Sequence, residues 1–344
     1  MNHYLKFCII TSIALNILCA CTSSNKKIEF LPTLDYEEPE IFSFQISEVL
    51  KPIDMVINDH YVCILNEEKQ NGEQIYVFDA ENLDFKYKFA HRGLGPEETI
   101  ALDIVKTMRG DTIDLIDQAN YKKLTYILTD SSPKLIKESL ISIPNVGPLQ
   151  ETYWISDSIL IFNTRNGDII TYNDNTNTII DTANLSSLIS GVDDEIKKKI
   201  GSFHFTVQGK EVVVGFRFFK QIIKFPLDSS FSFDISNLKP FSTENINFEN
   251  LFNNHTFFSF LASNDNLVVA QYYGKTLKSL QPFPVNFNGQ DLNYDIIILD
   301  RNLKPLNNYK IQMPVLRVFL DKKRKRVYFW NADDDFERLN YIQL

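Results

Sequence analysis

The feature that most constrains the fold of this chain is a strand pattern that recurs six times. Each copy has a short strand, a polar turn, a strongly apolar second strand, a loop, and a third strand that often ends in Asp or Asn. The copies begin roughly 46 to 58 residues apart, with second strands expected over residues 61–65, 113–116, 159–162, 212–216, 267–270 and 327–330. Third strands are expected over residues 75–78, 124–128, 169–172, 222–225, 296–299 and 339–342. Repeats of this length and strand content are typical of β-propeller blades.

The two ends of the repeat indicate how the ring closes. A fourth strand can be placed after the third in the first five copies, for example over residues 85–89, 135–143 and 306–311, but the sixth copy ends with the chain. A spare apolar strand precedes the first copy, at residues 41–49. We therefore predict an all-β fold, a six-bladed β-propeller over residues 41–344 whose N-terminal strand closes the last blade. A pair of β-sandwiches is the rival fold, but it predicts neither equal spacing nor a missing last strand.

Composition agrees with a folded chain of this kind, because 44% of the residues are hydrophobic and 13% are aromatic. Two stretches interrupt the strand pattern. Residues 184–200 predict a short helix capped at Asp193, and residues 245–255 predict another helical turn.

The N-terminus has the three parts of a secretory signal. A polar start containing Lys6 is followed by an apolar run over residues 7–18 and then by Cys19, Ala20 and Cys21. The run is roughly a dozen residues long, whereas a membrane-spanning helix needs about 20. We therefore predict a signal peptide at residues 1–20 rather than a transmembrane anchor.

The end of this segment resembles the bacterial lipobox, in which cleavage precedes a cysteine that carries lipid. The resemblance implies that Cys21 is acylated and that residues 21–40 form a lipid-anchored linker, which at roughly 3.3 Å per residue could reach about 60 Å. Residues 22–27 carry no acidic side chain, a pattern similar to outer-membrane retention. The expected location is the outer membrane, on its periplasmic or cell-surface side. An ordinary signal peptide cut elsewhere is the alternative.

Once Cys8 and Cys19 leave with the signal and Cys21 is acylated, Cys63 is the remaining thiol. It lies within the apolar run of residues 61–65, which favours a buried structural thiol over a nucleophile.

The loops predict which end of the propeller binds a partner. Turns between first and second strands are tight, whereas the opposite face carries the long loops near residues 66–73, 117–122, 163–168, 271–293 and 331–336. Long loops on a rigid scaffold concentrate binding residues. We therefore predict binding on this face, around the mouth of the central channel, by Arg92, Glu97, Glu98, Arg165, Tyr272, Tyr273 and Asp334.

The most specific motif on that face runs over residues 92–98, where Gly93 and Gly95 are expected to allow positive φ and Pro96 to fix the exit of the turn. It resembles the Gly-x-Gly-Pro-Gly-Glu signature that ends the first blade of TolB-like six-bladed propeller lipoproteins of the Bacteroidetes, with Glu97 in place of the third glycine. The resemblance implies the propeller fold and the lipid anchor, and brings no activity with it. A blade-linking turn without a ligand is the alternative interpretation of this motif.

Three other features leave alternatives open. Tyr272 and Tyr273, expected in the long loop, could stack on a sugar or peptide or could pack the loop onto the propeller. The run of Asp333, Asp334 and Asp335 offers oxygen ligands of the kind calcium takes, or forms a solvated turn. The basic turn at residues 322–326 is expected to be solvated, with contact to anionic head groups as the alternative.

Net charge and motif content limit the functions that this chain can have. The net charge of −9 makes a nucleic-acid partner unexpected. The four histidines beyond the signal are dispersed, and the sequence has no HExxH motif, paired-cysteine zinc spacing or nucleophile elbow. We predict a non-catalytic, monomeric scaffold without a cofactor that binds an envelope protein, a small glycan or a peptide. A metal-dependent, lactonase-like hydrolase or lyase with ligands around the central channel is the alternative.

Overall fold

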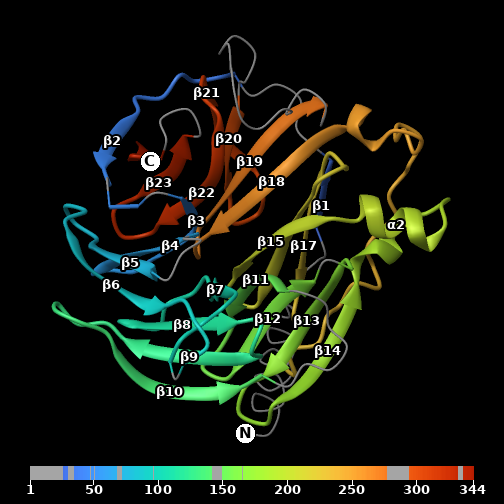
Figure 1. Ribbon diagram of the computed structural model, residues 1–344. Helices are drawn as coiled ribbons and strands as arrows, with labels where there is room; N and C mark the ends of the chain where they lie inside the picture. The colour runs from blue at the N-terminus through green and yellow to red at the C-terminus, as the bar shows by residue number, and fades with distance from the viewer. Residues whose placement is uncertain are drawn as a thin grey trace, which may run out of the picture.

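Six four-stranded antiparallel sheets surround a central channel in the manner of propeller blades (Figure 1). The computed structural model describes residues 26–29, 35–46, 48–49, 51–67, 72–95, 97–141, 149–164, 166–276, 294–331 and 336–344. The first strands of neighbouring blades contact one another, so they form the wall of the channel. The prediction of a six-bladed propeller is confirmed.

Each blade follows the same order from the channel outward. Blade one contains β3 (Pro52–Ile57), β4 (Tyr61–Asn66), β5 (Glu73–Asp79) and β6 (Phe85–His91), and blade two contains β7 (Leu102–Ile104), β8 (Thr112–Asp117), β9 (Lys122–Ile127) and β10 (Lys134–Leu140). Blade three contains β11 (Leu149–Trp154), β12 (Ile159–Thr164), β13 (Asp168–Asn173) and β14 (Thr178–Asn184), and blade four contains β15 (Phe203–Gln208), β16 (Glu211–Phe216), β17 (Gln221–Pro226) and β1 (Lys26–Glu29). Blade five contains β18 (His255–Ser263), β19 (Leu267–Thr276), β20 (Tyr294–Asp300) and β21 (Pro305–Ile311), and blade six contains β22 (Val315–Asp321), β23 (Arg326–Asn331), β24 (Arg338–Gln343) and β2 (Phe42–Gln45). All six expected pairs of second and third strands are present.

The strand expected at residues 41–49 closes the ring as predicted. Strand β2 pairs antiparallel with β24, with Phe42 opposite Tyr341 and Phe44 opposite Leu339. The rings of Phe42 and Phe44 both stack on Tyr341, at centroid distances of 5.1 and 5.3 Å. Backbone pairing and aromatic packing therefore join the two ends of the propeller.

Blade four differs from the expected pattern, in which its fourth strand follows its third. The chain leaves β17 at Pro226 and continues through turns, and its outer partner is β1, paired antiparallel with β17. Residues 35–40 also lie on the propeller, because the backbone of Glu37 bonds to Asn308 and Lys310 of blade five. These stretches fall within the predicted linker, and pairing with open strand edges holds them against the blades rather than away from them.

The second strands form the core between the blades. Every residue of β4 and β12 is buried, and clusters of apolar side chains from adjacent blades pack together. Cys63 lies in β4 with no exposed surface, and its burial raises the pKa of the thiol. The expected buried structural thiol is confirmed.

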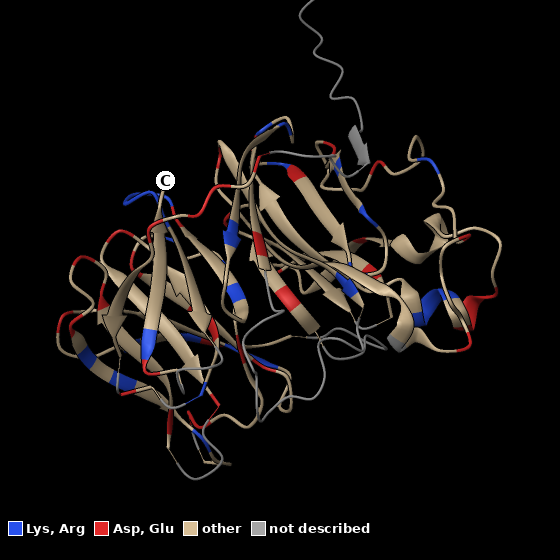
Figure 2. Cartoon of the chain, turned by 90° about the horizontal axis from the view of Figure 1, so that it is seen from above, with Lys and Arg blue, Asp and Glu red and all other residues tan. Residues whose placement is uncertain are grey.

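The two predicted helical inserts are also present. The 3-10 helix η1 (Leu185–Leu188) precedes α2 (Asp194–Ile200), where the Asp193 carboxylate accepts a hydrogen bond from the backbone of Ile196 at 2.9 Å. A second 3-10 helix, η2 (Leu251–Asn253), precedes β18. Over the described residues, no helix combines the length and apolar character needed to cross a membrane. Acidic and basic residues are both scattered over the loops and strands of the blades (Figure 2).

Candidate functional site

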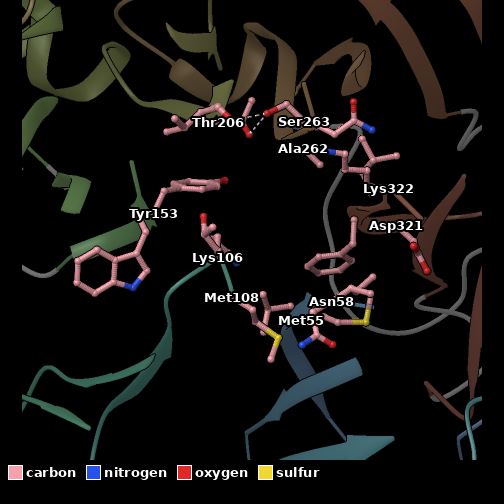
Figure 3. A pocket seen from close by; sticks show the side chains of 18 of the residues that line it. Met55, Asn58, Lys106, Met108, Tyr153, Thr206, Ala262, Ser263, Asp321 and Lys322 are labelled. Carbon is pink, nitrogen blue, oxygen red and sulfur yellow. Dashed lines mark hydrogen bonds between the residues drawn. The ribbon is translucent and has the colours of Figure 1, made fainter. Parts of the chain in front are cut away.

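All six blades contribute residues, from their innermost strands or from the turns that follow them, to a cavity of about 670 Å³ at one mouth of the channel. This mouth lies on the face of the tight turns between first and second strands, which we call the tight-turn face; the other face is the long-loop face. Figure 3 shows Met55, Lys106, Met108, Tyr153 and Ala262 around an open centre. The long loops predicted binding at the opposite mouth, and the residues that line this cavity were not among the predicted binding residues.

A three-residue ion cluster from three blades forms the cationic floor of the cavity. The buried Asp54 carboxylate of β3 pairs with Nζ of Lys106, which follows β7, and with Nη1 of Arg317 on β22, the latter at 3.2 Å. The side chain of Lys106 is 12% exposed and that of Arg317 is 33% exposed. Both cations line the cavity.

Irregularities in the innermost strands accompany these channel charges. The pairing of β3 with β4 shifts register between Pro52 and Asp54, and the pairing of β22 with β23 shifts between Val315 and Val318. A bulge re-aims side chains that regular alternation would direct otherwise. In the sequence, this channel site could have been recognised from charged residues within apolar strands, such as Asp54 and Arg317.

A second carboxyl group, on Asp103 of β7, lies near this cluster. Burial raises its pKa to about 7, and the negative charge of Asp54 adds to the effect, while Lys106 and Arg317 oppose it. Nε2 of Gln118 donates a hydrogen bond to the carboxyl group. Asp103 therefore titrates near neutral pH in the folded chain.

The opposite wall carries a paired acid and imidazole. Glu151 on β11 contacts Nδ1 of His204 at 3.1 Å and accepts a hydrogen bond from the backbone of Phe205 at 3.0 Å. The rings of His204 and Phe260 lie 4.7 Å apart, and the Arg317 guanidinium lies 4.7 Å from the same Phe260 ring. The carboxylate of Glu151 is thus occupied by partners within the chain.

The rim of the cavity is made of turns joined by charge pairs. His60 contacts Asp111 at 2.9 Å, and Lys322 pairs with Asp265. Arg324 differs from the expectation of a solvated basic turn, because its side chain is only 7% exposed and contacts Glu81 and the backbone oxygen of Asp59 in blade one. Arg324 therefore links the last blade to the first.

The predicted motif on the long-loop face forms a compact turn around Glu98. Its carboxylate accepts a hydrogen bond from the backbone of Gly95, and a Cβ on Gly93 or Gly95 would collide with it. Neither glycine has the expected positive φ. The turn requires glycine at these positions because a larger residue would leave no space for the Glu98 side chain. Glu97, which stands where the resembled signature has its third glycine, has φ +62°. Arg92 stands at the start of this turn, bridged to Thr99.

The predicted aromatic pair belongs to a strand and not to a loop. Tyr272 and Tyr273 lie within β19, which extends to Thr276. Both side chains are partly buried: Tyr273 packs edge-on against Tyr294 at 4.6 Å, and Tyr272 contacts Phe258 at 5.6 Å. Of the two interpretations left open, packing onto the propeller describes their contacts.

Some of the predicted site residues fall outside the described part of the chain. Cys21, Pro96, Arg165 and the aspartates 333–335, including Asp334, lie outside the described residues. The structure brings Arg92, Glu97 and Glu98 together in one turn, while Tyr272 and Tyr273 are in blade five.

The channel was also the place where the alternative enzyme interpretation expected metal ligands. Within the described ranges, no group of three or more His, Cys, Asp or Glu side chains could hold a metal ion. The channel carboxylates of Asp54 and Glu151 instead contact cationic or imidazole partners.

Comparison with known proteins supports the architecture. A predicted exported protein of Bacteroides fragilis superposes with a TM-score of 0.53 at 15% identity, covering 93% of this chain and 95% of that chain. The WD40 repeats of RRP9 superpose with a TM-score of 0.52 at 10% identity, covering 90% and 100%. The likeness establishes the fold alone. No family model and no curated protein matches the sequence.

Proposed function

We propose that this protein is a cell-envelope lipoprotein of the TolB-like type, anchored in the outer membrane through acyl chains on Cys21. The support is the apolar run of residues 7–18 followed by the lipobox-like sequence that ends at Cys21. Multiple acyl chains hold a protein stably on a membrane. The predicted exported protein of Bacteroides fragilis shares the fold, which agrees with this location.

The anchor is tested by the variant Cys21→Ser. Without the acyl chains, the variant should move from the membrane fraction to the soluble fraction and should no longer incorporate labelled fatty acid. Retention of the variant in the membrane fraction would show that another element anchors the protein.

We propose further that the propeller is a non-catalytic binding module for an envelope protein, a small glycan or a peptide. The observation that carries this proposal is the cavity to which all six blades contribute, open at one mouth of the channel. Its charged residues contact one another rather than forming a nucleophile with a base. A concave site with apolar walls and a few oriented polar groups is typical of ligand binding.

A protein partner is proposed to bind the long-loop face at the turn of residues 92–98. Leu94 is 85% exposed there, next to the exposed Glu97. Exposed apolar side chains beside charges suit a protein surface.

A pull-down from envelope extract tests this face, using Leu94→Asp with Glu97→Lys and, as the matched control, Lys322→Ser with Lys323→Ser on the tight-turn face. We expect the partner to be lost only with the first variant. Loss only with the second would place the partner at the tight-turn mouth, and the long-loop proposal would be abandoned.

A further inference from the structure

At the floor of the channel cavity, two cations share one contacting carboxylate. Lys106 and Arg317 share the single carboxylate of Asp54, while Glu151 on the opposite wall is engaged by His204 and the backbone of Phe205. While Asp103 is protonated, below its pKa of about 7, one of the two positive charges has no carboxylate to balance it. A buried charge without a counter-charge is costly, so the site then favours a further anion.

The hydrogen-bonding capacity of the two cations leads to the same conclusion. A guanidinium and an ammonium together offer about eight N–H donors, whereas one carboxylate has roughly four acceptor sites. Both Lys106 and Arg317 line the cavity, and a third of the Arg317 side chain is exposed. Donors therefore remain for a second acceptor inside the channel.

The walls indicate the rest of the ligand. Met55 and Met108 lie around the open centre (Figure 3). Phe260 and Phe319 line the same cavity. The Arg317 guanidinium lies over Phe260 at 4.7 Å, and Lys106 lies over Phe319 at 5.9 Å. Apolar walls above a cationic floor suit a molecule with an apolar body and one acidic end.

We propose that the channel cavity binds a monoanionic carboxylate with an apolar body, held by Lys106 and Arg317. The proposal rests on the binding function inferred above and names the ligand class of the same cavity. A volume of about 670 Å³ lies in the range of small-molecule sites. The ligand is either the C-terminus of an apolar peptide or a free aliphatic acid, which share this chemistry.

The charge of the site distinguishes a carboxylate from a phosphate. While Asp103 is protonated, a monoanion matches the single positive charge left after Asp54 is paired, whereas a dianion exceeds it. The rim carries Asp59, Asp111 and Asp265 against the two cations Lys322 and Lys323, so it gives a highly charged anion little attraction at the entrance.

Asp54 competes with the ligand for both cations. Replacing Asp54 should therefore change the ligand affinity in the opposite direction from replacing Lys106 or Arg317. Removing its charge in Asp54→Asn frees Lys106 and Arg317, so carboxylate binding should become tighter. A cluster that serves only to stabilise the fold would not bind more tightly when its central charge is removed.

The experiment is isothermal titration calorimetry on the full chain carrying Cys21→Ser, which avoids detergent in the apolar cavity, at about pH 6, where Asp103 is mostly protonated and the ligand carboxylate is ionised. The probes are N-acetyl-Ala-Phe with a free carboxylate, the same dipeptide as its amide, and octanoate. We expect the preferred acid to bind at least tenfold more tightly than the amide, because the amide lacks the charge.

Matched variants assign the contacts. Arg317→Gln and Lys106→Gln should each weaken acid binding about tenfold, and each leaves Asp54 one cation, which protects the fold. Arg317→Lys keeps the charge and should retain binding. Lys199→Ser, in α2 and outside the cavity lining, should change affinity less than twofold.

Each outcome decides one question. Binding of the dipeptide acid without octanoate identifies a peptide C-terminus as the source, and the reverse identifies a free aliphatic acid. Equal binding of acid and amide, or no response to Arg317→Gln, overturns the carboxylate assignment. If the protein keeps its envelope partner in the pull-down but binds neither acid, the carboxylate proposal is wrong and the proposed function still stands.

Discussion

At the scale of single residues, the polar positions of the repeat are explained by the turns that they close. The Asn58 side-chain oxygen accepts hydrogen bonds from the backbone of His60 and Tyr61, and Asn264 does the same for Asn266 and Leu267. Side-chain oxygens thus replace backbone partners where a strand reverses. This is why Asn recurs between the first and second strands of the pattern.

Glu97 is a residue whose backbone conformation favours glycine. Its φ of +62° is unfavourable for a side chain with a Cβ, so Glu97→Gly should stabilise the chain by about 1 kcal/mol. The measurement is the midpoint of urea denaturation. Leu94→Gly in the same turn is the control and should destabilise, because Leu94 lacks positive φ; an unchanged midpoint for Glu97→Gly would contradict the strain argument.

Asp103 makes stability depend on pH. Its pKa is raised to about 7 in the folded chain, by burial first and by Asp54 second, against the opposing charges of Lys106 and Arg317. Between about pH 4 and pH 7 the folded state keeps a proton that the unfolded state has released, so this contribution to stability is lost as pH rises.

The neutral variant Asp103→Asn should remove that loss. We expect the free energy of unfolding of this variant to exceed that of the wild type by at least about 1 kcal/mol at pH 8 and by much less at pH 5. Denaturant titrations at the two pH values measure the difference, and an advantage that is the same at both would contradict the assignment.

At the scale of elements, the innermost strands combine a structural and a chemical role. They pack blade against blade, and irregular pairing accompanies the channel charges on β3 and β22. The turn between β22 and β23 also acts across blades, since Arg324 contacts Asp321 in its own blade and Glu81 in blade one. The side chain of Asp321 is only 2% exposed, so its charge depends on this partner.

Replacing Arg324 therefore tests how the first and last blades are joined. Arg324→Met should destabilise the protein by about 3 kcal/mol, because it leaves a buried carboxylate unpaired. Lys322→Met removes an exposed pair in the same turn and should cost less than about 1 kcal/mol. Equal effects in thermal denaturation would argue against a closing role for Arg324.

At the scale of the whole molecule, the N-terminal segment follows the outer edges of three consecutive blades. Strand β1 completes blade four, residues 35–40 lie along blade five and β2 completes blade six. Ile46 and Val49, which follow β2, are each 1% exposed. Closure therefore involves both strand pairing and burial of apolar side chains.

Two shortened chains separate these contributions. A chain that begins at Lys51 loses β2, Ile46 and Val49 and should be destabilised by roughly 5 kcal/mol, from two buried side chains and an open strand edge. A chain that begins at Ile41 keeps these contacts and should lose less stability than the chain that begins at Lys51. Thermal denaturation compares them with the parent, and a chain from Lys51 that melts like the parent would refute closure by β2.

The sequence by itself determined the blade count, the second and third strands, the closing strand and the buried Cys63, because apolar alternation and turn residues act over a few neighbours. Only the tertiary structure decided that β1 pairs with β17, that Tyr272 and Tyr273 belong to a strand, and that a charged cavity opens on the tight-turn face. Asp54, Lys106 and Arg317 come from three blades, and residues separated by more than two hundred positions in the chain meet only when the ring closes. Local patterning carries no information about such encounters, which depend on the packing of one blade against the next.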